Sequence, residues 1–268
     1  MTTLLMRVVP LPLRTAQRSK YVFERNLMVY RRSWMVIFSG IFEPLFYLFS
    51  IGIGLGGYIG EVKGPGGVIV SYTAFVAPAL LASSAMNGAV FESTMNIFFK
   101  MKYQKTYDAM LSTPIGVPDI AVGEISWSLV RGALYAASFM VVMAGLGYVE
   151  SWWGVLAVPA AVLIGFAFGA VGMACSTFMR SWQDFDYVTV VTLPLFLFSA
   201  TFYPLEVYPP AIQAITRFSP LYHSAELIRA LTFGVFDWTI LGHIAVLVAM
   251  GAAGTAVVGR RLDGLLLK

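Results

Sequence analysis

The sequence predicts an all-α membrane protein with six transmembrane helices. The mean hydropathy is +0.76, and hydrophobic residues make up 58% of the 268 residues. Charged residues make up only 12%, whereas soluble domains carry about 25%. Six apolar stretches are candidates to cross a hydrocarbon core about 30 Å thick, which takes about 20 helical residues. Lys and Arg gather in every second connection between these stretches, as expected of a chain that passes back and forth through a bilayer.

The expected membrane-spanning helices follow one another from residue 34 to residue 258, and the fifth is the shortest. They are Trp34–Tyr58, Val68–Phe91, Ile120–Gly147, Trp153–Met179, Tyr187–Tyr203 and Phe236–Val258. Residues 1–33 precede this six-span domain, which covers residues 34–268.

The basic residues predict the orientation of the helices. If the spans alternate, 14 of the 18 Lys and Arg residues fall on one side and three on the other, and Arg131 lies inside the third span. Cytoplasmic connections carry the excess of Lys and Arg. We therefore expect a multi-pass protein of the plasma or inner membrane with both termini in the cytoplasm. The net charge of +4 is then explained by this topology and by contact with anionic membrane lipids, and it does not indicate nucleic acid as a partner.

Several functional classes lack their residues in this chain. No G-x-x-x-x-G-K-[ST] motif occurs, so no P-loop for ATP is expected. Cys175 is the single cysteine, and His223 and His243 lie on different segments, so we expect neither a disulfide nor a metal site. Gly52–Gly57 (GIGLGG) matches a dinucleotide-binding pattern, but these glycines end an expected transmembrane helix, where small residues favour close helix packing. No catalytic residue is predicted.

Residues 11–33 predict an amphipathic helix on the cytoplasmic surface of the membrane. One narrow stripe of the helix is basic, with Arg14, Arg18, Arg25 and Arg32. The opposite side is more apolar, with Ala16, Phe23, Leu27 and Tyr30. Such a helix suits the boundary between headgroups and acyl chains. The sequence leaves open whether it only sets the topology or also contacts a cytoplasmic partner.

The second connection, residues 92–118, predicts a cytoplasmic helix over residues 96–111 that ends before Pro114 and Pro118. Aromatic and charged side chains are interleaved along it: Phe99, Lys100, Lys102, Tyr103, Lys105, Tyr107 and Asp108. This composition is typical of a docking surface for another protein. An interfacial helix with no partner remains the alternative.

The main extracellular segment, residues 204–234, predicts two short helices near residues 210–218 and 221–233 that dip back into the outer leaflet. Its prolines interrupt any longer span. Charged side chains facing lipid at mid-depth cost roughly 2.5–3.5 kcal/mol each on insertion scales, so we expect protein to cover them. Glu226 and Arg229 lie three residues apart on one helix face and are candidates to close an outward path.

Three charged residues lie inside the first and third expected spans, namely Glu43, Glu124 and Arg131. Such residues are usually paired or functional. Glu43 and Arg131 lie at similar depths, and Glu124 shares a helix face with Arg131. We therefore expect Glu43 or Glu124 to hold Arg131, and a direct contact with a substrate is the alternative.

Several runs of the sequence together resemble the permease subunits of ABC exporters of the type-2 family, and most closely its NodJ-like branch. The runs are FEPLFYLFSIGIGLG (42–56), FESTMNIFFKMKYQKTYDAMLSTPI (91–115), VGEISWSLVRG (122–132), FLFSATFYPLEVYPP (196–210) and SPLYHSAELIRALTFG (219–234). The resemblance covers nearly the whole chain.

The resemblance implies a half-transporter that works with a second permease copy or paralogue and with separate ATPase subunits. ATP and magnesium would bind to the ATPase and not to this chain. Residues 1–33 would form a connector helix, residues 96–111 the coupling helix that contacts the ATPase, and residues 204–234 the re-entrant segment. The branch is associated with export of lipo-oligosaccharides, and drug exporters are among its relatives.

The substrate class stays open between a lipid-linked or lipo-oligosaccharide molecule and a hydrophobic drug. Aromatic residues of the first, second and fifth spans are candidates to line the transport path: Phe46, Tyr72, Phe75, Phe198 and Phe202. A membrane scaffold without transport activity and a secondary transporter are the alternative functions. Few ion-coordinating residues and no evident repeat speak against the latter.

Overall fold

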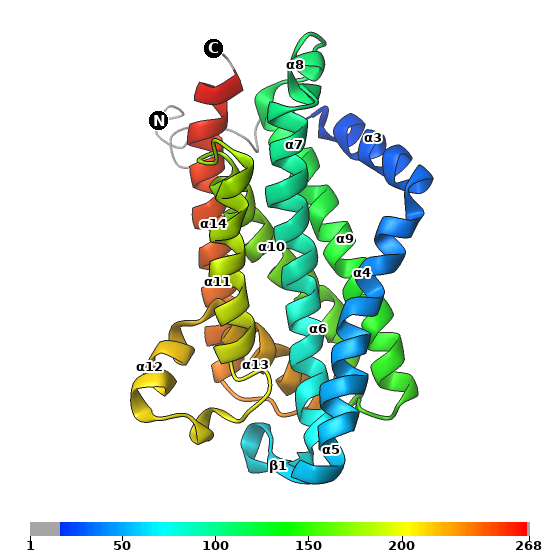
Figure 1. The fold of residues 1–268 in the computed structure, drawn as a ribbon, viewed down its shortest axis with the longest axis vertical. Helices are drawn as coiled ribbons and strands as arrows, with labels where there is room; N and C mark the ends of the chain where they lie inside the picture. The colour runs from blue at the N-terminus through cyan, green and yellow to red at the C-terminus, as the bar shows by residue number, and fades with distance from the viewer. Residues whose placement is uncertain (1–16, 267–268) are drawn as a thin grey trace, which may run out of the picture.

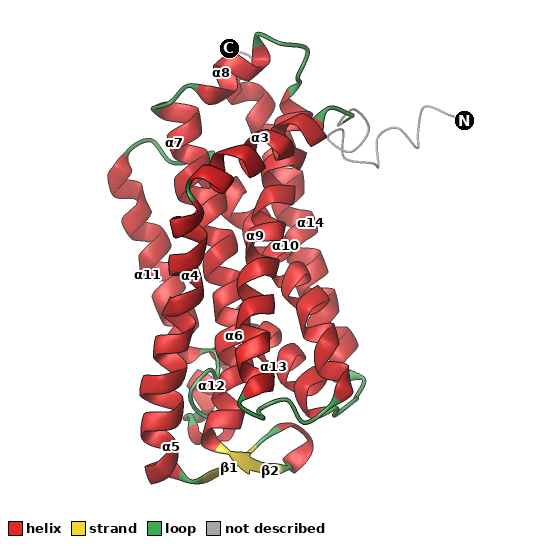
Figure 2. Cartoon of the chain, turned by 90° about the vertical axis from the view of Figure 1, so that its right-hand side faces the viewer, coloured by secondary structure: helices red, strands yellow, loops and turns green. Residues whose placement is uncertain are grey.

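The structure is a computed structural model, and it describes residues 17–266 as an elongated bundle of helices (Figures 1 and 2). The prediction of an all-α membrane protein is confirmed, apart from one small hairpin of two short strands. Residues 1–16, which include Arg14 and Ala16 of the expected amphipathic helix, lie outside the described residues, as do residues 267–268.

Helices of very different length follow one another along the chain. The first part of the chain contains α3 (Ser19–Arg32), α4 (Trp34–Tyr47), the π-helical segment η1 (Leu48–Ile53), α5 (Gly54–Ile59), β1 (Glu61–Lys63), the 3-10 turn η2 (Pro65–Gly67), β2 (Ile69–Ser71), α6 (Tyr72–Phe91), the π-helical segment η3 (Glu92–Asn96), α7 (Ile97–Lys102) and α8 (Thr106–Leu111). The second part contains α9 (Val117–Gly145), the 3-10 segment η4 (Trp152–Leu156), α10 (Ala157–Ser176), the 3-10 turn η5 (Trp182–Asp184), α11 (Phe185–Phe198), the 3-10 turn η6 (Leu205–Val207), α12 (Pro210–Phe218), α13 (Pro220–Phe233) and α14 (Thr239–Leu266).

Helix α6 forms the centre of the bundle (Figure 1). The Ser71 Oγ caps its first turn by accepting a hydrogen bond from the Ala74 N–H at 3.3 Å. From Tyr72 the helix continues through η3 and α7 to Lys102, and nearly all of α6 is buried. Because its Ala, Ser, Leu and Met side chains are apolar or small on every side, α6 can pack against α4, α9, α10 and α13 at once.

Among residues 17–266, five helical segments are long and apolar enough to cross a membrane. They are Phe42–Ile59, Tyr72–Lys102, Val117–Gly145, Trp152–Ser176 and Thr239–Leu262. The expected fifth span corresponds to α11, which has 14 residues and therefore a length of only about 21 Å. The helix runs along the bundle in both views, but the count of six spans stays a prediction.

Two expected helices have different ends in the structure. The second span begins at Tyr72 and not at Val68, because Ile69–Ser71 pairs with Glu61–Lys63 in an antiparallel hairpin. The expected single helix over residues 96–111 is wrong. Lys105 adopts a left-handed backbone conformation with φ of 48°, which interrupts the helix and separates α7 from α8.

Close approach of two helices depends on glycine at two places. A Cβ atom on Gly254 of α14 would lie 2.7 Å from the backbone of Ala170 and Val171 on α10. A Cβ atom on Gly56 would lie 2.7 Å from the Thr73 Oγ1. The glycines of the Gly52–Gly57 run therefore bring the first membrane helix against α6, as expected from their small size.

Different helices lie at the two ends of the bundle. Helices α3, α7 and α8 lie at one end, together with the carboxyl-terminal end of α14, whereas the β-hairpin, α12 and α13 lie at the other (Figure 1). Helix α3 buries Val22, Asn26 and Tyr30 and packs on α9. On the expected apolar side, Phe23 is half-buried, Leu27 is 50% exposed and Tyr30 is buried, and contact of this side with acyl chains stays a prediction. The two short helices expected near residues 210–218 and 221–233 are confirmed as α12 and α13.

Candidate functional site

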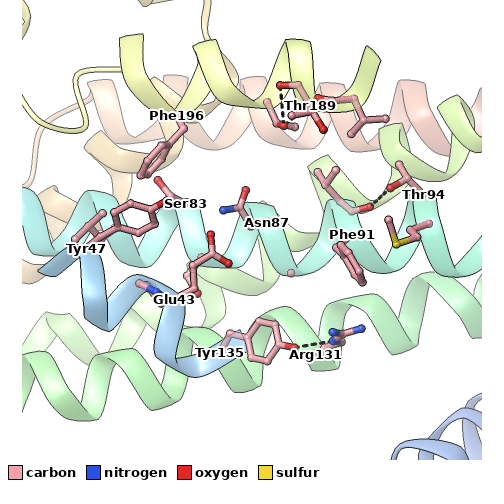
Figure 3. Close-up of a pocket in the computed structure, with 18 of the residues that line it drawn as sticks. Glu43, Tyr47, Ser83, Asn87, Phe91, Thr94, Arg131, Tyr135, Thr189 and Phe196 are labelled. Atoms are coloured by element: carbon pink, nitrogen blue, oxygen red, sulfur yellow. Dashed lines mark hydrogen bonds between the residues drawn. The ribbon is translucent and has the colours of Figure 1, made fainter. Parts of the chain in front are cut away.

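A partly open cavity of about 510 Å³ lies between α4, α6, α9 and α11 (Figure 3). Its α6 lining extends from Leu80 to Phe91, around the midpoint of the segment Tyr72–Lys102. Aromatic rings form part of the cavity wall. Two of them, those of Tyr47 and Phe196, are in contact, with ring centroids 5.3 Å apart. A concave site that combines apolar walls with a few polar groups is typical of ligand sites.

Glu43 and Asn87 project polar groups into the cavity. Figure 3 shows both side chains directed into the space between α4 and α6. Within the described part of the chain, neither side chain makes a hydrogen bond or an ion pair. An intramembrane carboxylate without a protein partner is a strong indication of a functional site.

Arg131 and Tyr135 of α9 form another part of the lining. The Arg131 Nε donates a hydrogen bond to the Tyr135 hydroxyl at 2.9 Å. The Arg131 Nη1 pairs with the Glu92 carboxylate and donates to the Tyr30 hydroxyl at 3.0 Å. The prediction that a carboxylate within the bundle holds Arg131 is confirmed, but the expected partners were wrong, since neither Glu43 nor Glu124 contacts it.

Glu92 is the hub of a buried polar network. Its Oε2 accepts hydrogen bonds from the Tyr30 hydroxyl at 2.7 Å and from the Asn96 Nδ2 at 2.6 Å. Its Oε1 lies 3.8 Å from the Lys100 Nζ. Since Tyr30 belongs to α3 and Arg131 to α9, Glu92 joins three elements at the level where the membrane helices meet the α7–α8 end.

Lys100 extends the network to Glu124. Its Nζ lies 2.7 Å from the Glu124 Oε2, and the Asn26 Nδ2 donates to the same oxygen at 3.0 Å. The four charged side chains are nearly inaccessible, and two carboxylates balance two cations. Removing one member of such a set leaves a buried charge without compensation, which costs about 3–5 kcal/mol in soluble proteins.

Two tyrosines beside this network, both outside the membrane spans, have raised pKa values. Burial, followed by the negative charge of Glu92, raises the pKa of Tyr30 far above its ordinary value. Burial, followed by the nearby Glu124, likewise raises the pKa of Tyr107. Both phenols are therefore neutral over the physiological range and are available as hydrogen-bond donors.

The expected docking segment divides into buried and exposed residues. Lys100 and Tyr107 are buried within the chain, and Tyr107 belongs to the same buried hydrophobic cluster as Val22 and Ile120. This burial is at odds with direct ATPase contact by these two residues. The exposed side chains are those of Lys102, Tyr103, Lys105 and Asp108, and Phe99 is half-buried.

Glu226 and Arg229 form the expected pair at the other end of the bundle. The Arg229 Nη1 donates to the Glu226 Oε1 at 2.7 Å. Arg229 is fully buried and lies over the Phe75 ring, with its guanidinium carbon 3.7 Å from the ring centroid. Its remaining hydrogen bonds go to the carbonyl oxygens of Phe75, Ala200 and Thr201. The pair therefore fixes α13 to α6 and to the segment after α11.

The expected path residues do not form one surface. Tyr72, Phe75 and Phe202 are buried in the core of the chain and cannot line an open path in this conformation. Phe46 and Phe198 are exposed on the bundle, and their place along a path stays a prediction.

His223 and His243 lie on different segments, but the fold brings their Nδ1 atoms to 2.7 Å from each other. Sequence reasoning missed this pair. Within residues 17–266, no group of three or more His, Cys, Asp or Glu side chains is placed to hold a metal ion.

Sequence reasoning also missed Tyr30, Glu92 and Asn96 as network residues. One signal was available, since Glu92, Asn96 and Lys100 follow one another at intervals of four residues, which places them on one helix face. Treating Glu92 as the start of a loop concealed this pattern.

The fold is that of a multi-pass membrane protein with a cavity between its membrane helices, as in transport proteins. Residues 17–233 match the ABC-2 type transporter family, and the chain belongs to this family. It is the permease subunit of an ABC exporter, and such permeases work with an ABC ATPase subunit in the inner membrane.

The chain is similar to curated relatives over most of its length. It is 37% identical to Nodulation protein J of Rhizobium leguminosarum bv. trifolii over 248 residues, which cover 90% of this chain and 92% of that protein. It is 35% identical to Nodulation protein J of Rhizobium meliloti (strain 1021), over 80% of each chain. It is also 24% identical to the inner membrane transport permease YadH of Escherichia coli (strain K12), over 85% of this chain and 88% of that protein. The predicted resemblance is confirmed.

Proposed function

We propose that two permeases of this kind form an export path for an amphiphile, and that ATPase subunits dock on the α7–α8 end and bind ATP and magnesium. In this proposal α11 completes six spans, and both termini lie in the cytoplasm with α7 and α8. Residues 1–33 act as the connector segment. The Glu226–Arg229 pair holds the extracellular re-entrant helices in place.

The single observation that carries the proposal is the division of the α7–α8 segment. Its tip, residues 102–105, presents Lys102, Tyr103 and Lys105 to solvent. Its two arms are anchored inside the bundle by Lys100 and Tyr107. A force applied by an ATPase at the tip would therefore act on Glu124 and α9 through the buried network.

The network also reaches the cavity. Arg131 is bonded to Glu92 and at the same time lines the cavity wall. A shift of α7 relative to α9 would move Arg131 and change the shape of the site. This connection gives a physical route from ATP-driven closure to release of a substrate.

A second permease would cover the cavity. The exposed faces of α4 and α11, which flank the cavity, carry large apolar side chains: Phe38, Phe42, Phe46, Tyr187, Val190, Val191 and Leu193. Two copies packed through these faces would enclose a path between them. In this arrangement the exposed Phe46 and Phe198 lie along the contact between the two permeases.

The substrate that this proposal favours is a lipo-oligosaccharide or another lipid-linked saccharide, because the chain is similar to Nodulation protein J. A hydrophobic drug is the alternative within the same mechanism. In both cases the apolar part would remain near lipid while the polar part enters the cavity.

The test uses Tyr103→Ala in the full chain, co-purified with its ATPase and reconstituted in lipid vesicles. Tyr103 is 61% exposed, so the variant should fold normally. We expect at least a tenfold loss of ATP-driven transport, since large anchors dominate interfaces.

The matched control is Tyr58→Ala, which removes an exposed tyrosine of α5, a helix at the opposite end of the bundle from α7 and α8 (Figure 1). It should leave transport unchanged. Full transport and full ATPase coupling in Tyr103→Ala would show that the ATPase does not dock on this segment.

A further inference from the structure

Helix α11 is a loosely packed wall of the cavity. Its first residue, Phe185, is the one buried residue of this helix. The residues that follow either line the cavity, as Thr189 and Thr192 do, or are exposed on the outside of the chain, as Tyr187 and Val190 are. Because so little of α11 is buried, the position of its first turn depends on how Phe185 is held.

Phe185 belongs to an aromatic cluster between the start of α11 and the α7–α8 segment. Its ring centroid lies 5.2 Å from that of Phe98 on α7 and 5.3 Å from that of Trp182 in η5. The Trp182 ring also lies 5.0 Å from Phe99 of α7, and Phe99 lies 5.3 Å from Tyr103. Aromatic pairs at such distances attract one another beyond the effect of buried area. A continuous series of rings therefore leads from the exposed Tyr103 to α11.

The turn that carries Trp182 is fixed to α11 by Asp184. The Asp184 carboxylate accepts hydrogen bonds from the backbone N–H of Arg180 at 2.6 Å and of Ser181 at 3.1 Å. Such a capping arrangement sets the direction in which the chain enters a helix. Since α11 follows η5 without an intervening loop, the turn and the first part of α11 move as one piece.

The aromatic cluster and the charged network reach different walls of the cavity. The network joins Glu92 to Arg131, which belongs to α9 and lines the cavity. The aromatic cluster ends at Phe185, which belongs to α11 and lines the same cavity. A displacement of α7 would therefore act on α9 through ion pairs and on α11 through rings.

We propose that Trp182 is a positioning residue that makes α11 follow the α7–α8 segment when an ATPase moves this segment. Its ring lies between Phe99 of α7 and Phe185 of α11 and contacts both. A shift of α7 then moves the start of α11 and changes the width of the cavity. This inference rests on the proposed function and adds a second route, separate from the charged network, from the docked ATPase to the cavity.

The test measures the reactivity of one cysteine on α11. Thr189→Cys is introduced into a Cys175→Ala chain, because Cys175 is exposed and would also react. Thr189 is exposed and lines the cavity (Figure 3). The complex of permease and ATPase in lipid nanodiscs is treated with N-ethylmaleimide, either free of nucleotide or trapped with ATP, magnesium and orthovanadate. We expect trapping to change the modification rate by about threefold or more, since switching proteins commonly shift packed helices past one another.

Trp182→Ala should remove most of this response. Without the ring, α7 no longer contacts Phe185 through η5, and the two rates should differ by less than about 1.5-fold. The nucleotide-free rate and the amount of co-purified ATPase should match those of the parent chain, because Trp182 is 46% exposed and Asp184 still caps the turn. Trp182→Phe keeps a ring between the two helices and should retain a response of about twofold or more.

Trp152→Ala is the matched control and should keep the full response. Trp152 is 95% exposed in η4, which packs on α13 at the opposite end of the bundle. A full response in Trp182→Ala would overturn the proposal, and so would the absence of a response in the parent chain, since α11 would then not move with the ATPase. Equal loss in Trp182→Phe, or loss of ATPase from the Trp182→Ala complex, would also overturn it, because Trp182 would then serve the fold or the docking itself.

The same cysteine separates this inference from the docking proposal. If Tyr103→Ala loses the response and Trp182→Ala keeps it, the ATPase docks as proposed and only the link to α11 is wrong. If Tyr103→Ala keeps the response and Trp182→Ala loses it, the docking residue is wrong and the link to α11 stands.

Discussion

Two buried arginines, one in the middle of the bundle and one at its hairpin end, are held in different ways. Arg131 lies at the middle of α9 and lines the cavity, and Arg229 lies on α13 at the end opposite α7 and α8. Both are almost fully inaccessible, and each has a carboxylate partner. They differ in what accepts their remaining hydrogen bonds.

The partners of Arg131 are side chains, and those of Arg229 are mainly backbone. Arg131 bonds to Glu92, Tyr30 and Tyr135, two of which come from other elements. Arg229 bonds to three backbone carbonyls, and its carboxylate partner Glu226 is partly exposed.

This difference separates a contact that can rearrange from one that cannot. Side-chain partners can change rotamers and exchange hydrogen bonds while their helices shift. Backbone carbonyls move only with their whole segments. The contacts of Arg131 can therefore rearrange when α3, α6 and α9 shift, whereas those of Arg229 hold α13 to α6 and to the segment after α11.

The largest expected loss of stability follows from replacing Arg229. Arg229→Met should lower the free energy of unfolding by about 3–5 kcal/mol, because the buried carbonyl oxygens of Ala200 and Thr201 lose their charged donor. Chemical unfolding of the purified permease in detergent would measure this loss.

Adding Glu226→Gln to Arg229→Met should not restore the stability. Glu226 is partly hydrated, and the loss comes from the carbonyls. A recovery of more than about 1 kcal/mol in the double variant would show that the ion pair carries the stability, and not the hydrogen bonds from Arg229 to the backbone carbonyls.

Replacing Arg131 should cause a similar loss of stability, and a second substitution should recover part of it. Arg131→Met leaves the buried Glu92 carboxylate without its main counter-charge, at a cost of about 3–4 kcal/mol. Adding Glu92→Gln removes that charge and should recover about 2 kcal/mol. Additive losses in the double variant would contradict a network built on compensating charges, and thermal unfolding of the four proteins would complete the cycle.

Much of the fold could be predicted because its causes are local. The lengths of the apolar runs predicted four of the spans. Most of their predicted ends lie within a few residues of the helix ends in the structure. Proline positions placed α12 and α13, since Pro209 and Pro210 begin one helix and Pro220 begins the next. The hairpin of β1 and β2 was missed because three-residue strands leave almost no periodic signal.

The candidate site was less predictable because its residues meet through tertiary packing. Helix α6 is apolar on every side, so its sequence does not show which face Tyr72 and Phe75 occupy, and both proved to be buried. Hydropathy ended the second span at Phe91, although the helix continues, which separated Glu92 from its true partner Arg131. The exposure of Glu43 toward the cavity depends on where α11 lies, and no local pattern encodes that.

The smallest effect concerns Tyr30, which links α3 to the Arg131 network. Its hydroxyl donates to Glu92 at 2.7 Å and accepts from Arg131 at 3.0 Å. Tyr30→Phe should therefore lower stability by about 1–2 kcal/mol at pH 8. Tyr21→Phe, in the same helix but at an exposed position, is the matched control and should be neutral.

The effect of Tyr30→Phe should shrink at alkaline pH. The pKa of Tyr30 in the folded chain is raised above the ordinary value of 10, so the neutral phenol stabilises the folded state fully below pH 10. Above pH 10 the phenol ionises in the unfolded chain first, and the contribution falls by about 1.4 kcal/mol for each pH unit. Unfolding measured at pH 8 and pH 10.5 should therefore show the native chain losing stability relative to Tyr30→Phe. A constant difference between the two proteins across this range would mean that the Tyr30 hydroxyl is hydrated and lies outside the network that surrounds Arg131.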